Sequence, residues 1–408
     1  MTRLLRLGAA AVAGIVVGAG ASLAVQSGAD PEAGPVPGPA TPATAAAPTT
    51  VTPDPDPGDG TRPSATRAPT VLAWTAGGLP ADFAQAARAL PETAATTVVA
   101  GDPVLVDAVH DAGGARHPSP PPGLVLGLDA IGIDPTTYGP FAARRDRGAV
   151  EGLAAGQALV GTTSAAVHGL APGDRVHLRG GPVVEIVGVV DDRSVAAAEL
   201  VLPAAGAGAA GVTTPRYLLA RPAGAAAPLV TALRALAPEQ PLRVRTEGET
   251  PYLRSSDAVL PQSRIAATFG SFAFTPTPGA RELRPEPAWV DANIVAADVP
   301  VLGRVRCHRS LIPALRGALQ ELADRNLAGL VETYDGCYNP RLVAVGGSIS
   351  RHAWGAAIDL NFGGNRTGFT SIQDPRLVEV MARWGFASGD GWLVPDPGHF
   401  EYVGPPRP

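Results

Sequence analysis

The sequence is divided by a stretch that cannot fold on its own. Residues 28–69 consist mainly of Pro, Ala, Thr, Asp and Gly, and include the run Pro-Asp-Pro-Asp-Pro at 53–57. A stretch of this kind cannot bury a hydrophobic core, and its prolines favour extended, polyproline-like geometry. We therefore expect a disordered linker here, with the globular part of the chain after it.

The residues before this linker have the pattern of an export segment. Arg3 and Arg6 precede an apolar run over residues 7–25. Positive charge ahead of such a run keeps the N-terminus in the cytoplasm and directs the rest of the chain outward. Residues 1–27 are expected to be either a cleaved signal peptide or a single membrane anchor. The linker that follows favours the anchor, because it would serve as a spacer across part of a cell wall.

Composition limits the remaining possibilities. The chain has 408 residues, of which 45% are hydrophobic and 17% charged, so it can hold two domains or more. Its net charge is −5 and it has no long basic block, which argues against nucleic acid as a partner.

Residues 70–247 have an α+β pattern. Apolar runs predict strands at 71–74, 97–100, 200–202 and 217–219, and helical spacing predicts helices at 82–90, 163–169 and 225–236, the first capped by Asp82. Alternating residues on both sides of Gly180-Gly181 predict a β-hairpin. We expect a separate extracellular domain with no catalytic cluster. Its histidines, which are expected at the surface or in packing roles, are His110, His117, His168 and His177.

Part of this region faintly resembles a known module. The run 164–191, with its small helix, its Gly-Leu-Ala-Pro-Gly-Asp turn and the hairpin, resembles the extracellular core domain of bacterial ABC-transporter permeases of the MacB and FtsX kind. Those permeases have several membrane spans and this chain has at most one. The resemblance implies that only the soluble module is shared, and it suggests an envelope protein as a partner of this domain.

Residues 248–408 begin with a loop-rich connecting segment. A helix is predicted at 310–326 and a strand at 330–334. Cys307 and Cys337 are the only cysteines of the chain, and in an exported protein an isolated pair is most simply a disulfide. Closing this loop would stabilise the fold by roughly 3–4 kcal/mol in the chain-entropy model. A metal-binding pair is the alternative, which the oxygen and nitrogen ligands nearby make less favourable.

Near the end of the chain lie residue types that bind zinc. His352 and Asp359 are separated by small and apolar residues, and Asp396 and His399 follow downstream. Two histidines and one carboxylate can fill three corners of a zinc tetrahedron and leave the fourth to water. An acid three residues before the last histidine can take a proton from that water. The pattern predicts a zinc hydrolase.

These residues belong to longer motifs that resemble a known family. Ser-x-His-x-x-Gly-x-Ala-x-Asp at 350–359, followed by Asp-x-x-His-Phe-Glu at 396–401, is similar to the D-alanyl-D-alanine carboxypeptidase and L-alanyl-D-glutamate peptidase family, the VanY-like zinc peptidases. Tyr338-Asn339-Pro340-Arg341 fits the same family. The resemblance covers about residues 260–408 and implies a hedgehog/DD-peptidase-like α+β fold.

The resemblance also implies roles for individual residues. The proposed zinc ligands are His352, Asp359 and His399. Asp396 would be the general base, and Arg341 would polarise the scissile carbonyl and stabilise the oxyanion. Ser350 would bind substrate and Glu401 would orient His399. On the residues themselves, Gly355 and Ala357 are small enough to let the backbone come close to the metal or substrate. The two nearby tryptophans, Trp354 and Trp392, are expected to pack in the core rather than to form a substrate wall.

Three functional hypotheses follow. The first is a zinc peptidase that hydrolyses peptidoglycan stem peptides, as a D,D- or L,D-carboxypeptidase or an endopeptidase, at the extracellular face of a bacterial plasma membrane or in the cell wall. The second is a non-catalytic zinc-containing binding module, like hedgehog signalling domains. The third is a sensor or scaffold partner of a transporter or division complex. The presence of Asp396 and Arg341 favours the first. The sequence leaves open the bond that is cut and the oligomeric state.

Overall fold

The computed structural model describes residues 69–344 and 346–405. The predicted export segment, residues 1–27, and residues 28–68 of the predicted linker lie outside this part. By their contacts, the described residues belong to one compact unit, and the boundary expected near residue 247 stays a prediction. Within the described residues, no helix has the length and apolar character needed to cross a membrane.

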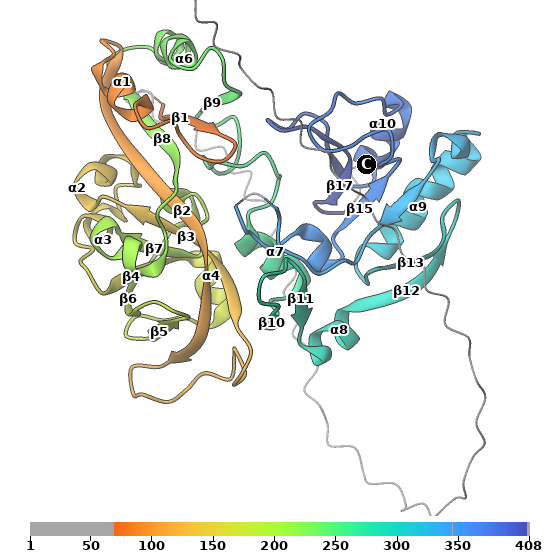
Figure 1. The fold of residues 1–408 in the computed structure, drawn as a ribbon, viewed down its shortest axis with the longest axis horizontal. Helices are drawn as coiled ribbons and strands as arrows, with labels where there is room; N and C mark the ends of the chain where they lie inside the picture. Colours follow the sequence, from red (N-terminus) through yellow and green to blue (C-terminus); the bar gives the residue numbers. More distant parts are fainter. Residues whose placement is uncertain (1–68, 345, 406–408) are drawn as a thin grey trace, which may run out of the picture. The chain divides into compact units, whose positions relative to one another are not determined.

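Residues 71–246 contribute a mixed nine-stranded sheet with the order β3-β7-β4-β6-β5-β2-β8-β1-β9. Its strands are β1 (Val71–Thr75), β2 (Thr93–His110), β3 (Leu126–Ile133), β4 (Gln157–Gly161), β5 (Arg175–Leu178), β6 (Val183–Val190), β7 (Leu200–Pro203), β8 (Pro215–Pro222) and β9 (Leu242–Thr246). The long strand β2 pairs with β3, β5 and β8, and it runs the length of the sheet (Figure 1). The strand predicted at 97–100 is therefore only one part of β2.

Helices cover this sheet at several points. They are α1 (Phe83–Ala89), α2 (Pro135–Tyr138), α3 (Arg147–Glu151), α4 (Thr162–His168), α5 (Ala204–Ala207) and α6 (Ala226–Ala235). The predicted hairpin is formed by β5 and β6, and Gly180 in its turn has a φ of +70°, a conformation that favours glycine. The capping role predicted for Asp82 is wrong, because its side chain makes no capping hydrogen bond to α1.

The histidines of this region take part in packing. The His168 side chain is 5% exposed, and its Nε2 lies 3.2 Å from a carboxylate oxygen of Glu199, which is buried. The Gln262 amide also donates to Glu199, over 2.6 Å. His110 and His177 contact each other through ring nitrogens 3.0 Å apart. These contacts agree with the packing roles that the sequence predicts.

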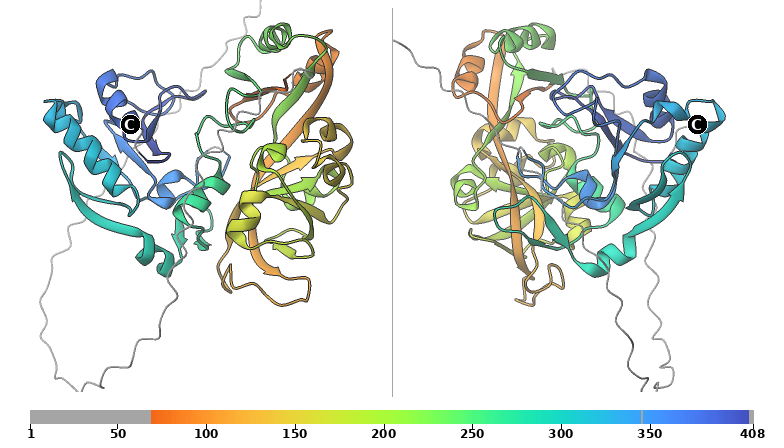
Figure 2. Two further views of the ribbon diagram at one scale, coloured as in Figure 1. Left: turned by 180° about the vertical axis from the view of Figure 1, so that it is seen from behind. Right: turned by 45° about the vertical axis from the view of Figure 1, so that its right-hand side comes forward.

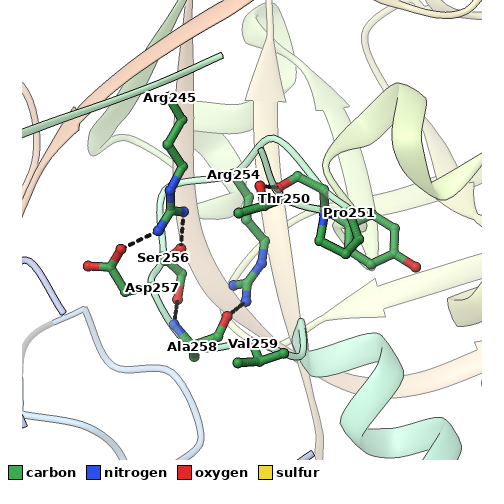
Figure 3. A pocket seen from close by; sticks show the side chains of 9 residues that line it. Arg245, Thr250, Pro251, Arg254, Ser256, Asp257, Ala258 and Val259 are labelled. Atoms are coloured by element: carbon green, nitrogen blue, oxygen red, sulfur yellow. Dashed lines mark hydrogen bonds and ion pairs between the residues drawn. The ribbon is translucent and has the colours of Figure 1, made fainter. Parts of the chain in front are cut away.

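A short segment connects the nine-stranded sheet to the C-terminal elements, and arginines hold it. Arg245 on β9 donates to the Ser256 carbonyl over 2.7 Å and forms an ion pair with Asp257, as Figure 3 shows. Asp257 also accepts a hydrogen bond from the backbone N–H of Leu393. Arg254 donates to the Ala258 carbonyl within the segment itself. The loop-rich sequence therefore has a defined path.

The C-terminal part contains a second sheet of four strands, in the order β14-β15-β17-β16. They are β14 (Tyr334–Gly336), β15 (Ala357–Leu360), β16 (Phe386–Gly389) and β17 (Asp396–Tyr402). The C-terminal part also contains two hairpins, β10 (Phe274–Pro276) with β11 (Leu283–Pro285) and β12 (Ile294–Val299) with β13 (Gly303–His308). Its described α-helices are α7 (Gln262–Phe269), α8 (Pro287–Asn293), α9 (Ile312–Asp324) and α10 (Pro375–Arg383). Helix α9 lies along the β12–β13 hairpin in Figures 1 and 2.

Helix α9 corresponds to the helix predicted at 310–326, and its apolar face is buried as the spacing requires. The strand predicted at 330–334 is wrong: Ala328–Leu330 is a 3-10 helix, and β14 begins only at Tyr334. The N–H groups of Glu332 and Thr333 donate to the Asn361 side chain over 2.7 and 3.0 Å. Because a side chain satisfies this backbone, no strand partner is needed.

Cys307 on β13 and Cys337 after β14 form a disulfide, as the sequence predicts. Both residues are buried in the main C-terminal hydrophobic cluster. The bridge therefore joins the β12–β13 hairpin to the segment that leads toward the motif at 350–359.

A buried histidine next to this bridge makes stability depend on pH. Nε2 of His308 lies 3.1 Å from the Phe269 carbonyl, to which it donates, while Nδ1 accepts from the Ser310 N–H over 3.2 Å. Burial lowers the pKa of His308 to about 4. An unfolded histidine has a pKa of about 6.5, so below that pH the unfolded chain binds a proton that the folded chain does not.

We predict that acid destabilises the fold through His308. Stability should be lost as the pH falls from 6.5 to 4, by about 2 kcal/mol between pH 7 and pH 5. In His308→Gln, whose amide can still donate to Phe269 but does not titrate, this part of the loss should be absent. Urea unfolding of both proteins at the two pH values measures the difference, and an equal pH dependence in both would contradict the assignment.

Candidate metal centre

Strand pairing brings two of the predicted ligands together. In the antiparallel pairing of β15 with β17, Asp359 lies opposite His399, and Ala357 lies opposite Glu401. Directly opposed residues point to the same face of a sheet, and residues two apart on one strand share a face. Asp359, His399 and Glu401 therefore share one face.

His352 reaches the same place from a 3-10 turn, Arg351–Trp354. The Ser350 hydroxyl accepts a hydrogen bond from the His352 N–H over 3.3 Å and caps this turn. Gly355 ends the turn with a φ of +62°, and a Cβ at this position would lie 2.6 Å from the backbone nitrogen of His308. The backbone at Gly355 thus packs closely against the backbone of His308, while the close approach to metal or substrate expected from the sequence stays a prediction.

The three predicted ligand side chains converge. His352 Nε2 lies 3.1 Å from Asp359 Oδ1 and 3.1 Å from His399 Nδ1, and His399 Nδ1 lies 2.9 Å from Asp359 Oδ1. In the described part of the chain, these residues form the one cluster of three or more acidic, His or Cys side chains able to hold a metal ion. Zinc bonds of 2.0–2.1 Å in a tetrahedron place ligand atoms about 3.3 Å apart. The cluster is therefore close to the spacing that a zinc ion needs.

The other nitrogen of each histidine also has a partner. His352 Nδ1 lies 2.7 Å from the Cys337 carbonyl, to which it donates, and His399 Nε2 lies 3.6 Å from Glu401. A carbonyl or carboxylate behind a histidine is the usual arrangement at metal sites, because it fixes which nitrogen faces the metal. Here His352 presents Nε2 and His399 presents Nδ1.

The electrostatics of the cluster favour a cation. Burial raises the pKa of Asp359, but hydrogen bonds with His352 and His399 together lower it by more than burial raises it. The carboxylate therefore stays ionised. Burial lowers the pKa of His399, yet Asp359 and Glu401 raise it to about 10. The site therefore stabilises positive charge despite its burial.

Asp396 is the first residue of β17, three residues before His399. Its Oδ1 accepts a hydrogen bond from the Thr367 hydroxyl over 2.8 Å. Burial raises its pKa, and His399 and Thr367 oppose this only in part. Thr367 carries no motif signal in the sequence, and its role is visible only in the fold.

Arg341 lies beside the cluster on an irregular hairpin. Its carbonyl accepts from the Ser350 N–H over 3.0 Å, and a β-bridge joins Leu342 to Ile349. No hydrogen bond or ion pair engages its guanidinium within the described residues. Arg341, Ser350, Asp396 and the three candidate ligands line one cleft of about 780 Å³.

The two tryptophans lie in different surroundings. Trp354 is 2% exposed and donates to the Gly270 carbonyl over 3.0 Å, so its predicted core role is confirmed. Trp392 lines the cleft with its ring centroid 5.5 Å from that of His399, so the core position predicted for it is wrong. It lies on the loop between β16 and β17, which carries its side chain to the candidate metal cluster.

Comparison with known proteins gives a family for this region. Residues 344–402 match the family model described as D-alanyl-D-alanine carboxypeptidase. The match contains His352, Asp359, Asp396 and His399, and it covers less than half of the chain. The candidate metal cluster thus lies in a region similar to a peptidase family, while Arg341 lies just ahead of it. No curated protein matches the chain.

Two solved structures share weak similarity with the chain. The periplasmic region of MacB from Actinobacillus actinomycetemcomitans has 10% identity, with 43% of this chain and 88% of that chain covered and a TM-score of 0.30. The extracellular domain of the noncanonic ABC-type transporter YknZ from Gram-positive bacteria has 12% identity, with 43% and 99% covered and a TM-score of 0.29. MacB is one of the permeases that residues 164–191 resemble in sequence.

We predict that metal binding depends on the two histidines. His352→Ala and His399→Ala should each lose stoichiometric zinc, because two ligands cannot hold the ion as three do. His110→Ala, which removes a histidine from the nine-stranded sheet, is the matched control and should keep one zinc per chain. Elemental analysis after dialysis measures this. Retention of a full equivalent of zinc in the double variant His352→Ala/His399→Ala would show that the ion binds elsewhere.

Proposed function

We propose that the C-terminal part of this chain, residues 248–408, is a zinc-dependent peptidase that hydrolyses the stem peptides of peptidoglycan. The observation that carries the proposal is the convergence of His352, Asp359 and His399 in a cleft that also contains Asp396 and Arg341. The peptidase-family match over residues 344–402 supports the reaction class and the cell-wall substrate.

The residues present fit zinc. Two imidazole nitrogens and one carboxylate oxygen are its ordinary ligands, and the set leaves a fourth position open. Bound zinc would supply Lewis-acid chemistry, polarising a carbonyl and lowering the pKa of water at the open position. In this assignment Cys337 and Glu401 hold the two histidines in the orientation that the ion needs.

Asp396 is the proposed general base. Its Oδ1 accepts from Thr367, while Oδ2 has no hydrogen-bond partner among the described residues, which leaves a carboxylate oxygen able to take a proton. Burial raises its pKa toward the range in which a carboxylate both accepts and returns a proton. Asp396 would take the proton of the attacking water and deliver it to the amine that leaves.

Arg341 is the proposed partner of the developing oxyanion. Its guanidinium is permanently charged and free of other partners within residues 69–344 and 346–405, so it does not need to break an ion pair before it meets substrate. Ser350, which caps the turn that carries His352, would act mainly by holding that ligand in place. Ser350 also lines the cleft, where its hydroxyl would contact substrate.

The chain would act in the cell envelope. The arginine-flanked apolar run at residues 7–25 and the proline-rich residues that follow support export, either anchored to the membrane or released. The nine-stranded sheet would then lie on the outer side and bind an envelope protein.

We predict that Asp396→Asn lowers kcat by about 10²–10⁴-fold on a purified stem peptide, because the amide keeps the shape of the side chain but cannot accept a proton. Zinc occupancy should be unchanged. Thr367→Ala is the matched control: it removes the hydrogen bond to Asp396 but keeps the carboxylate, so its loss should be much smaller. Mass spectrometry of the products also identifies the bond that is cut. Near wild-type kcat in Asp396→Asn at full zinc occupancy would refute the base assignment and favour a non-catalytic zinc-binding module.

We also predict that Arg341→Lys damages activity although it keeps the charge, because lysine lacks the planar fork of donors. The loss should fall on kcat if the contact exists only in the transition state, and on KM if it also holds the bound substrate. Steady-state hydrolysis at full zinc occupancy separates the two. Arg281→Lys, an exposed arginine that also lines the cleft, is the control and should remain close to wild type.

A further inference from the structure

A backbone carbonyl holds the Nδ1 side of the His352 ring. Its Nδ1 lies 2.7 Å from the Cys337 oxygen, whereas its Nε2 lies 3.1 Å from Asp359 and from His399. A carbonyl can only accept, so Nδ1 carries a proton, and in the neutral ring that a metal ion requires Nε2 then holds the lone pair that faces the cluster. Displacement of this carbonyl would free both the ring orientation and the position of the proton.

The residue that provides this carbonyl is one half of the disulfide. Cys337 follows directly after β14, and Gly336 before it has a φ of +126°. Beyond it, the Tyr338 N–H donates to the Arg306 carbonyl and the Asn339 N–H donates to the His352 carbonyl, each over 2.9 Å. Cys337 makes no ladder hydrogen bond with β14 or its partner strand. The bridge to Cys307 therefore ties Cys337 to β13 in place of strand pairing.

The other half of the disulfide is firmly placed. Cys307 lies on β13, opposite Val295 on β12, and is fully buried. The next residue, His308, donates its N–H to the Gly355 carbonyl over 3.0 Å. Gly355 ends the turn that carries His352. The strand that holds Cys307 is thus tied to both sides of this ligand: to Cys337 by the bridge and to Gly355 by a hydrogen bond.

We propose that the Cys307–Cys337 disulfide is a positioning element of the metal centre, which holds the Cys337 carbonyl against His352 Nδ1 and thereby sets metal affinity. The proposal deepens the proposed function and rests on its assignment of His352 as a ligand. The bridge acts through His352 and does not itself contact the ion. Loss of a partner that orients a ligating histidine typically costs 10–100-fold in metal affinity, which is the effect expected here.

This arrangement couples metal binding to oxidation of the chain. Transfer of a disulfide from a donor protein would convert the two thiols to the bridge, with two electrons and two protons passing to the donor, which leaves as a dithiol. Oxidising surroundings of this kind exist outside the cytoplasm and are rare within it. The chain would therefore reach its full metal affinity only after export.

The test compares zinc affinity in the full chain with and without the bridge. Wild type, Cys307→Ala/Cys337→Ala and Leu322→Ala are titrated by competition with a chromogenic zinc chelator at a temperature at which all three are folded. Leu322 is a fully buried residue of α9, and its truncation destabilises the same hydrophobic cluster without touching the site. The double cysteine variant should bind zinc 10–100-fold more weakly, and Leu322→Ala should stay within about threefold of wild type.

The results separate the two levels of the argument. If oxidised wild type binds no zinc, the proposed function itself fails. If wild type binds zinc and the double cysteine variant matches it within threefold, or if Leu322→Ala weakens binding as much as the double variant does, the disulfide is a stabilising bridge only and the positioning role is wrong.

A second measurement covers the case in which the double variant does not fold. In the zinc-free wild type, the His352 Nδ1 proton is followed by NMR, with His352→Gln used to assign the signal. A phosphine then converts the bridge to two thiols, and the phosphine becomes its oxide with oxygen from water. Faster exchange or loss of the signal while the methyl spectrum stays folded supports the proposal, and an unchanged signal overturns it.

Discussion

The antiparallel pairing of β15 with β17 is the interaction on which the site depends. Ile358 and Phe400 lie opposite each other in this ladder and are fully buried, while Asp359 and His399, one residue along, face the cleft. A shift of one residue in either strand would exchange these faces. Burial of the apolar pair therefore fixes the register that brings the acid and the imidazole together, and the hydrophobic core determines the geometry of the candidate metal site.

The sequence predicted those parts of the site that are encoded locally. His352, Ser350 and Gly355 lie in one short motif, and the capped turn explains their spacing: Ser350 begins the turn and Gly355 ends it. The Cys307–Cys337 bridge could be predicted because the chain has no other cysteines. The α+β character of the part preceding residue 248 and the hairpin around Gly180 follow from alternation and turn residues, which also act over a few positions.

Contacts between distant segments could not be predicted. Thr367 reaches Asp396 from a loop that has no motif of its own, and Trp392 reaches His399 from the loop between β16 and β17. The strand expected at 330–334 is replaced because Asn361, some thirty residues later, satisfies the N–H groups there. In each case a side chain that is remote in sequence decides the local outcome, and neither propensity nor periodicity contains that information.

The two acids of the second motif show how surroundings can divide one chemistry into two roles. Burial raises the pKa of Glu401, but His399 and Arg351 lower it below its usual value, so this carboxylate stays ionised and suits a group that orients a histidine. Asp396, the first residue of the same strand, accepts a hydrogen bond from Thr367, and burial leaves its pKa raised. Two carboxylates whose environments move their pKa values apart can serve as a fixed charge and a proton acceptor, respectively. His399 lowers the pKa of Glu401 most, and Arg351 adds to this effect, because the turn that presents His352 also places Arg351 3.6 Å from Glu401. One short segment thus supplies a candidate ligand, His352, and an arginine that helps to keep the carboxylate behind His399 charged.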